Sequence, residues 1–198
     1  MPEKKKSIKV PHKTIPYKPP KLVEWRDVDT YLLQARTYPY GECWLETRFR
    51  TEGSGLTQVM VTRVQPNDRL VFAIFVVDLL CLGVKDCFYN MNYSKANFKR
   101  KLEMVAIQRE LITPAYANGL IYGAIDFAAR FGLPPHALFE KASLVLDPPG
   151  TYPPPEDIEF GQEGKPVFIP GPYDDMDKIL DQLRQTVGEG NFGFLYPL

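Results

Sequence analysis

The chain has 198 residues, of which 44% are hydrophobic and 24% are charged, so it is long and apolar enough to bury a core without disulfides or metals. Its 24 basic and 24 acidic residues cancel, but residues 1–23 carry seven lysines against one acid, and residues 147–198 carry ten acids against three bases. The first residues are charged, which argues against a signal peptide, and the three cysteines have no paired spacing, which argues against a secreted disulfide framework. The longest apolar run is too short to span a membrane. Together these features predict a cytoplasmic location.

A basic, proline-rich arm is predicted over residues 1–23, ahead of a single α+β domain over residues 24–198. Five prolines fix the backbone φ and remove hydrogen-bond donors in this arm, which favours an extended conformation over a helix. Extended basic arms bind along phosphate backbones, and a histidine or tyrosine among the lysines can stack on an unpaired base. The candidate RNA-binding residues are Lys4, Lys5, Lys6, Lys9, His12, Lys13, Tyr17, Lys18 and Lys21. The alternative is that the arm lies on the acidic surface of its own domain.

The first part of the domain has one helical pattern followed by strand patterns. Helical spacing of apolar residues from Trp25 to Tyr38 predicts a helix that ends at Pro39. Strands are then predicted over residues 43–49, 56–64 and 70–80. The last of these is apolar on both faces, so we expect it at the centre of the sheet, and the intervening turns favour antiparallel pairing. Gly83 interrupts this run, and we expect residues 84–89 to continue the same strand past a bulge or bend.

The second half is predicted to be mainly helical. Ser94 as an N-cap predicts a helix over residues 94–109, and Thr113 followed by Pro114 predicts a helix that runs to Phe131. We expect these two helices to cover one side of a mostly antiparallel sheet of four to six strands, which is an α+β fold. The remaining predictions, in chain order, are a short helix over residues 134–146, a proline-rich linker over 147–156, a hairpin from 158–160 and 166–169, an acidic helix over 173–187 and a strand over 191–196.

Three segments of the domain, taken together, resemble a family of proteins. They are VDLLCLGVKDCFY at 77–89, IYGAIDFAARFGLPPHALFEKA at 121–142, and EFGQEGKPVFIPGPYDD with VGEGNFGFL at 159–175 and 187–195. The combination resembles uncharacterised bacterial proteins with the motifs VDxxCLGVKD, GAxxFAxxxGxxPHxxF and GKPxxIxGP, and it covers residues 40–196. No activity is attached to that family, so the resemblance implies a shared fold and carries over no catalytic residue.

The end of the third predicted strand is a first candidate for chemistry. Asp78 stands there, followed by Lys85 and Asp86, and an ionisable residue beside a buried strand is costly unless it is paired. Two carboxylates near a lysine can hold a metal or activate water, as they do in many nucleases. The structural alternatives are an ion pair of Lys85 with Asp78 or Asp86, or an Asp78 side chain that caps the turn around Gly83.

His136 is a second candidate, with Glu140 four residues further along the chain. The two could share a metal or form an acid–base dyad, but a zinc site needs three or four ligands and the folded region offers no second histidine. No metal or cofactor is therefore predicted, and a histidine that caps or packs in its loop is the simpler interpretation. Cys81 or Cys87 would be a nucleophile only in contact with His136, and thiols in apolar runs are usually inert.

The function predicted from these observations is non-enzymatic. The chain lacks the motifs GxSxG, HExxH and CxxC, which lowers the expectation of several common enzyme classes. We expect an RNA- or ribonucleoprotein-associated protein, with the ribosome as one such particle and the arm bound to RNA phosphates. One alternative is a protein–protein adaptor that uses the acidic helix and the proline segments. Another is a metal-dependent hydrolase or nuclease that uses Asp78 and Asp86, with His136 as a further candidate.

Overall fold

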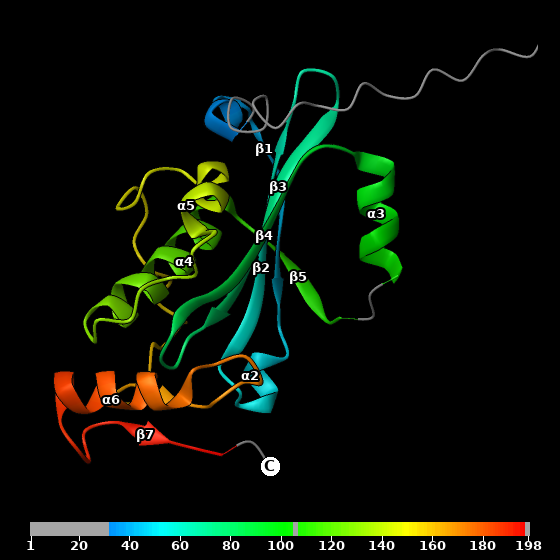
Figure 1. The fold of residues 1–198 in the computed structure, drawn as a ribbon. Helices are drawn as coiled ribbons and strands as arrows, with labels where there is room; N and C mark the ends of the chain where they lie inside the picture. Colours follow the sequence, from blue (N-terminus) through cyan, green and yellow to red (C-terminus); the bar gives the residue numbers. More distant parts are fainter. Residues whose placement is uncertain (1–31, 105–106, 197–198) are drawn as a thin grey trace, which may run out of the picture.

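The computed structural model describes residues 32–104 and 107–196 (Figure 1). The predicted arm over residues 1–23 and the start of the predicted helix at Trp25 lie outside the described residues. Of that helix the structure describes helical backbone at residues 32–34, followed by the 3-10 helix η1 (Ala35–Thr37).

A five-stranded antiparallel sheet forms the centre of the fold, in the order β4-β3-β2-β1-β5. Its strands are β1 (Tyr40–Glu46), β2 (Leu56–Val64), β3 (Arg69–Asp78), β4 (Gly83–Ser94) and β5 (Arg109–Ile112). The predicted α+β class with a mostly antiparallel sheet is confirmed. The strand expected at the centre, β3, is an interior strand between β4 and β2, and β2 is the middle strand. The pairing of β3 with β2 is unbroken from Leu56 opposite Asp78 to Val64 opposite Leu70.

One predicted strand continuation and one predicted helix boundary were wrong. Residues 84–89 do not continue β3, because the chain turns back over residues 79–82 and Gly83, with a φ of 65°, begins the antiparallel strand β4. A Cβ at Gly83 would lie 2.9 Å from the carbonyl oxygen of Ala124, so both the turn and the close helix contact require glycine. The helix predicted to reach residue 109 ends at Met104, and β5 follows it. Four residues are too few to show an alternation in sequence.

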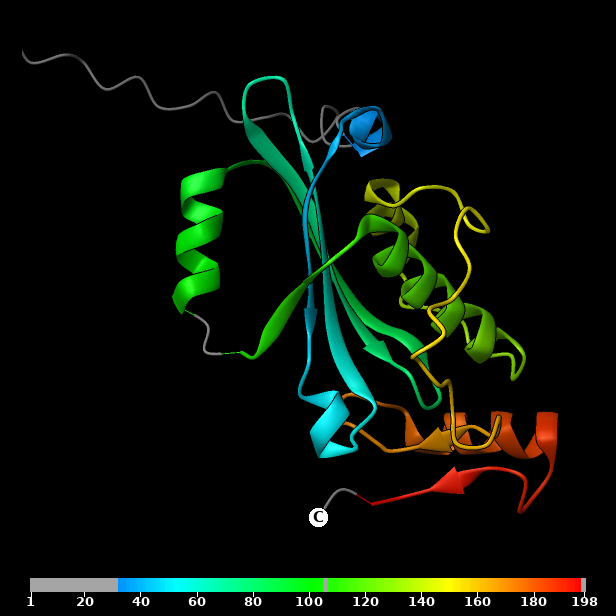
Figure 2. The same cartoon turned by 180° about the vertical axis from the view of Figure 1, so that it is seen from behind.

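The helices before and after β5 in the sequence lie on opposite faces of the sheet, as Figures 1 and 2 show, and not on one side as expected. Helix α3 (Lys95–Met104) packs on one face, and helix α4 (Pro114–Ala129) packs on the other. The reason is that β3 carries apolar side chains on both faces, so each face requires a cover. Thr113 caps α4 as predicted, because its hydroxyl accepts a hydrogen bond from the Tyr116 amide.

The face covered by α4 holds the larger apolar core. Its fully buried strand residues include Leu45, Val59, Val61, Val71, Phe75 and Val77, and α4 adds Leu120 and Ile121. The proline-rich segment after residue 147 also lies against this helix, because a Cβ at Gly119 would come within 2.1 Å of the carbonyl oxygen of Pro153. Glycine at this position lets the two backbones touch.

The last part of the chain forms a smaller apolar cluster beside the first core, around Phe131, Phe168 and Leu183. Its elements are α6 (Met176–Val187) and the two-residue parallel pair β6 (Val167–Phe168) and β7 (Gly193–Phe194). Residues 158–160 are not a strand, so the hairpin predicted there was wrong, and the turn is closed only by a bridge between Gln162 and Lys165. The remaining short elements are α2 (Phe49–Glu52), α5 (Phe139–Ala142) and η2 (Ser143–Val145). None of the helices in the described part of the chain is long and apolar enough to cross a membrane.

Candidate functional site

The carboxylate of Asp78 is used by the fold. Only 6% of this residue is exposed, and its two oxygens accept hydrogen bonds from the backbone amides of Leu80, Cys81 and Leu82 at 2.8, 3.1 and 3.2 Å. Burial raises the pKa of Asp78, and these amide bonds act in the opposite direction. The predicted turn cap is therefore what the structure shows, and the oxygens that a metal or a water would need are occupied.

Lys85 forms its ion pair with neither of the predicted partners. Its ammonium lies 2.6 Å from Asp174, whose carboxylate also accepts a hydrogen bond from the Gly171 amide at 2.7 Å. The interpretation of Lys85 as a partner of Asp78 or Asp86 was wrong, because tertiary packing brings Asp174, 89 residues along the chain, next to Lys85. The pair joins the start of β4 to the segment that leads into α6.

His136 does approach Cys87, which the sequence could not show. The Cys87 sulfur and an Asp86 carboxylate oxygen each lie 3.8 Å from His136 Nδ1, and that nitrogen accepts a hydrogen bond from the Leu138 amide at 3.3 Å. Burial, followed by the charge of Asp86, raises the pKa of Cys87 to about 11, so the thiol stays protonated at neutral pH. This arrangement lacks the thiolate that nucleophilic catalysis needs.

The described residues contain no group of three or more His, Cys, Asp or Glu side chains that could hold a metal ion. Among them no hydrogen bond or ion pair joins His136 to Glu140, and the buried Cys81 has its pKa raised far above the ordinary thiol value, first by burial and then by Asp78. The segment Gly188–Gly193 has the spacing GxGxxG, but it leads from α6 into β7. A dinucleotide-binding loop leads from a strand into a helix.

A more promising surface lies on the α3 face of the sheet. The pairing register places one apolar side chain from each strand in a single row across all five strands: Leu111, Trp44, Met60, Ile74 and Phe88. The two ends of the row are open to solvent, with Leu111 59% and Phe88 54% exposed. Large apolar side chains exposed at both ends of one row indicate a surface that another molecule can cover.

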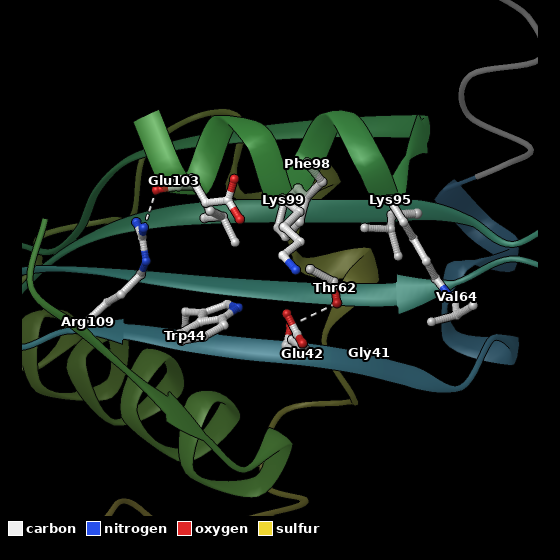
Figure 3. A pocket seen from close by; sticks show the side chains of 12 residues that line it. Gly41, Glu42, Trp44, Thr62, Val64, Lys95, Phe98, Lys99, Glu103 and Arg109 are labelled. Atoms are coloured by element: carbon white, nitrogen blue, oxygen red, sulfur yellow. Dashed lines mark hydrogen bonds between the residues drawn. The ribbon is translucent and has the colours of Figure 1, made fainter. Parts of the chain in front are cut away.

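Helix α3 covers only part of this face. Phe98 of α3 packs on Phe72 of β3, with ring centroids 5.0 Å apart, and Leu102 joins the same cluster. Cavities of about 580 and about 200 Å³ remain between the helix and the sheet. They share Trp44, Phe98, Leu102 and Arg109, so we treat them as one site and name it the α3 groove. The larger cavity is shown in Figure 3.

The polar groups of the α3 groove are unevenly satisfied. The indole Nε1 of Trp44 is buried and has no hydrogen-bond partner among the described residues. Glu42 and Lys99 also line the larger cavity, and no ion pair or hydrogen bond of either side chain occurs within residues 32–104 and 107–196. Figure 3 shows Lys99 reaching from α3 toward β1 and the Trp44 nitrogen on the β1 side of the cavity. Glu42 and Lys99 are exposed residues, so the buried Trp44 nitrogen is the group whose lack of a partner indicates a binding site.

Arg109 at one end of the groove is held by the protein itself. Its guanidinium donates to the carbonyl oxygen of Leu102 and lies 6.0 Å from the centre of the Trp44 ring. These contacts tie β5 to the C-terminal end of α3. Arg109 therefore shapes the groove as well as contributing charge to it.

Sequence reasoning did not single out this groove. The alternation over β1 places Trp44 on the face opposite Cys43 and Leu45, and this was the available signal that a large aromatic faces away from the main core. What pairs with Trp44, and how far α3 lies from it, depends on strand register and helix placement. Neither follows from local patterns.

Comparisons with known proteins add no relative. No family model, no curated protein and no solved structure matches this chain. The resemblance to uncharacterised bacterial proteins therefore stays a prediction, and the α3 groove has to be interpreted from its own chemistry.

Proposed function

We propose that this protein is a non-catalytic RNA-binding protein and that the α3 groove is where its folded part contacts single-stranded RNA. The observation that carries the proposal is the combination of cations and apolar rings on one face. Helix α3 has four basic residues and one acid among its ten residues: Lys95, Lys99, Arg100, Lys101 and Glu103. The described chain has more acids than bases, so this helix stands out.

The floor of the groove supports the same proposal. Bases of single-stranded RNA stack on aromatic and apolar side chains while cations beside them bind the phosphates. Trp44, Phe88 and Tyr93 line the groove, and the Lys101 ammonium lies 5.7 Å from the Tyr93 ring centre. The cavities are lined by the cations Lys95, Lys99, Lys101 and Arg109 and by the acids Glu42, Glu46 and Glu103. Cations for phosphates thus lie beside apolar rings for bases.

The basic arm fits this proposal as a second contact. Its seven lysines would add phosphate contacts to those of α3, and such contacts give affinity without reading sequence. We propose a cytoplasmic ribonucleoprotein particle, such as the ribosome, as the partner. The acidic residues 147–198 would keep the rest of the surface away from the phosphates.

The test is fluorescence anisotropy with a short labelled single-stranded RNA at about 50 and about 200 mM salt. We expect affinity to fall steeply with salt, and the double variant Lys99→Glu/Arg100→Glu to lose about tenfold or more in affinity. The matched control is Lys165→Glu/Lys178→Glu, which reverses two exposed cations outside the groove. Equal losses for both variants would mean that net charge, and not the groove, determines binding. No binding by the full chain would refute the proposal.

A protein–protein adaptor is the second candidate, and one observation favours it. The open ends of the apolar row, Leu111 and Phe88, would also suit an apolar side chain of a protein partner. Purification that yields one stoichiometric protein and no nucleic acid would support the adaptor. Loss of that protein in Phe88→Ala would place its contact on the α3 groove.

A further inference from the structure

The larger cavity of the α3 groove contains a hydrogen-bond donor that the protein leaves unused. An indole nitrogen can only donate, and a buried donor without an acceptor is destabilising. Trp44 Nε1 is in this state among the described residues, and its ring lines the cavity. A ligand that presents an acceptor here, such as a carbonyl oxygen, would recover that cost.

An exposed carboxylate without a hydrogen-bond partner among the described residues lies on the same strand. Glu42 is two residues before Trp44 in β1 and lines the same cavity. An ionised carboxylate only accepts hydrogen bonds, and its two oxygens can receive two donors. The cavity therefore offers one donor and one two-oxygen acceptor side by side on β1. The complementary ligand edge has one acceptor followed by two donors.

Among the four RNA bases, guanine presents such an edge. Its carbonyl O6 is followed by N1–H and N2–H, and bases read by proteins outside a duplex are read on this Watson–Crick edge. Adenine and cytosine present their donor where guanine has its acceptor. Uracil offers a single N–H donor to the carboxylate. Sites built to form hydrogen bonds discriminate strongly against ligands that leave their groups unpaired.

The rest of the cavity suits a nucleotide. Its volume of about 580 Å³ is within the range of small-molecule sites, and Leu70, Phe98 and Leu102 give apolar walls for a ring. Lys99, which has no partner among residues 32–104 and 107–196, reaches over the cavity from α3 and could meet a phosphate (Figure 3).

We propose that the cavity between α3 and β1 binds a guanine base of single-stranded RNA. Trp44 Nε1 donates to O6, Glu42 accepts from N1–H and N2–H, and Lys99 binds the adjoining phosphate. This inference rests on the proposed RNA-binding function and adds a base preference to it.

The test combines calorimetry with GMP, AMP, CMP and UMP and anisotropy with two RNAs, oligouridine with and without one central guanosine. We expect GMP to bind about tenfold or more tighter than the other nucleotides, which corresponds to about 1.4 kcal/mol. Glu42→Gln and Trp44→Phe should each remove this preference. The control Glu140→Gln, an exposed carboxylate on α5, should keep it. Thermal melting of each variant shows that it is folded.

The possible failures are distinguishable. RNA binding without any preference for guanosine overturns the guanine site and leaves the proposed function standing. If GMP binds more tightly than the other three nucleotides but neither RNA binds, the cavity assignment stands and the proposed function is refuted. Binding of a hydrocarbon carboxylate such as decanoate, with no nucleotide bound, overturns both and makes the cavity a site for an amphipathic anion.

Discussion

The two faces of the sheet differ in how completely the protein covers them. On the α4 face, the apolar side chains of the three central strands are fully buried, and even the charged Arg63 is only 3% exposed. On the α3 face, one ten-residue helix leaves about 580 and about 200 Å³ unfilled, and the apolar row is open at both ends. The same strands supply both faces. The α4 face therefore holds most of the buried core, and the α3 face is the one that we propose binds RNA.

The largest effect that would test this division is expected at Phe75. Its side chain is fully buried on the α4 face and packs against Phe139 at a ring-centre distance of 6.0 Å. Phe75→Ala should lower the free energy of unfolding by about 3–5 kcal/mol, because it removes buried area and leaves a cavity. Urea denaturation measures this loss. A loss of less than about 1 kcal/mol would contradict the assignment of the core to this face.

The second largest effect concerns the charged group buried on the α4 face. Arg63 donates to Asp147 at 2.7 Å and to the backbone carbonyls of Val145 and Tyr38. Asp147→Asn should cost about 2–3 kcal/mol, since the guanidinium would stay buried without its counter-charge.

The same pair predicts an acid dependence. Burial alone would raise the pKa of Asp147, but hydrogen bonds from Arg63 and Tyr152 lower it below the ordinary 3.8. Because the pKa is lower in the folded state, this stabilisation is complete above pH 3.8 and is lost as the pH falls through the folded-state value. Unfolding followed between neutral pH and pH ~2 should show a smaller decline in Asp147→Asn than in the native chain. Equal declines would show that the pair does not contribute.

A third effect, of intermediate size, distinguishes a turn-capping role of Asp78 from a metal-binding role. Asp78→Ala should cost about 1–3 kcal/mol, because three backbone amides in the turn between β3 and β4 lose their acceptor. Addition of Mg²⁺ or Mn²⁺ should leave the melting temperature of the native chain unchanged. Metal-dependent stabilisation that disappears in Asp78→Asn would instead revive the hydrolase alternative.

The smallest stability effect is expected on the α3 face. Phe88 is 54% exposed and its ring centre lies 6.1 Å from that of Phe72, so Phe88→Ala should lower the free energy of unfolding by only about 1 kcal/mol. RNA affinity should fall, since the substitution removes a ring from the border of the groove. This pattern is the opposite of that expected for Phe75→Ala, and equal stability losses for both would end the distinction between the faces.

Local signals in the sequence were sufficient for much of the fold. Strand β2 has the predicted bounds, Thr113 caps α4, and the β-branched and aromatic residues of β3 indicated a strand inside the sheet. These features depend on residues close together in the chain. Conversely, β5 and the reversal before Gly83 were missed because a four-residue edge strand and a tight turn become clear only through their pairing and packing partners.

The candidate sites show the same contrast between local contacts and contacts that depend on the tertiary structure. The sequence alone identifies Asp78 as a costly buried charge that needs partners, and it offers a cap of the adjoining turn as one solution, because that interaction is local. Only the tertiary structure decided three other contacts. Lys85 pairs with Asp174, the Cys87 sulfur lies near His136, and Trp44 lines a cavity beneath α3. Each of these joins residues brought together by strand register and helix packing, and such contacts leave no mark in the spacing of residues along the chain.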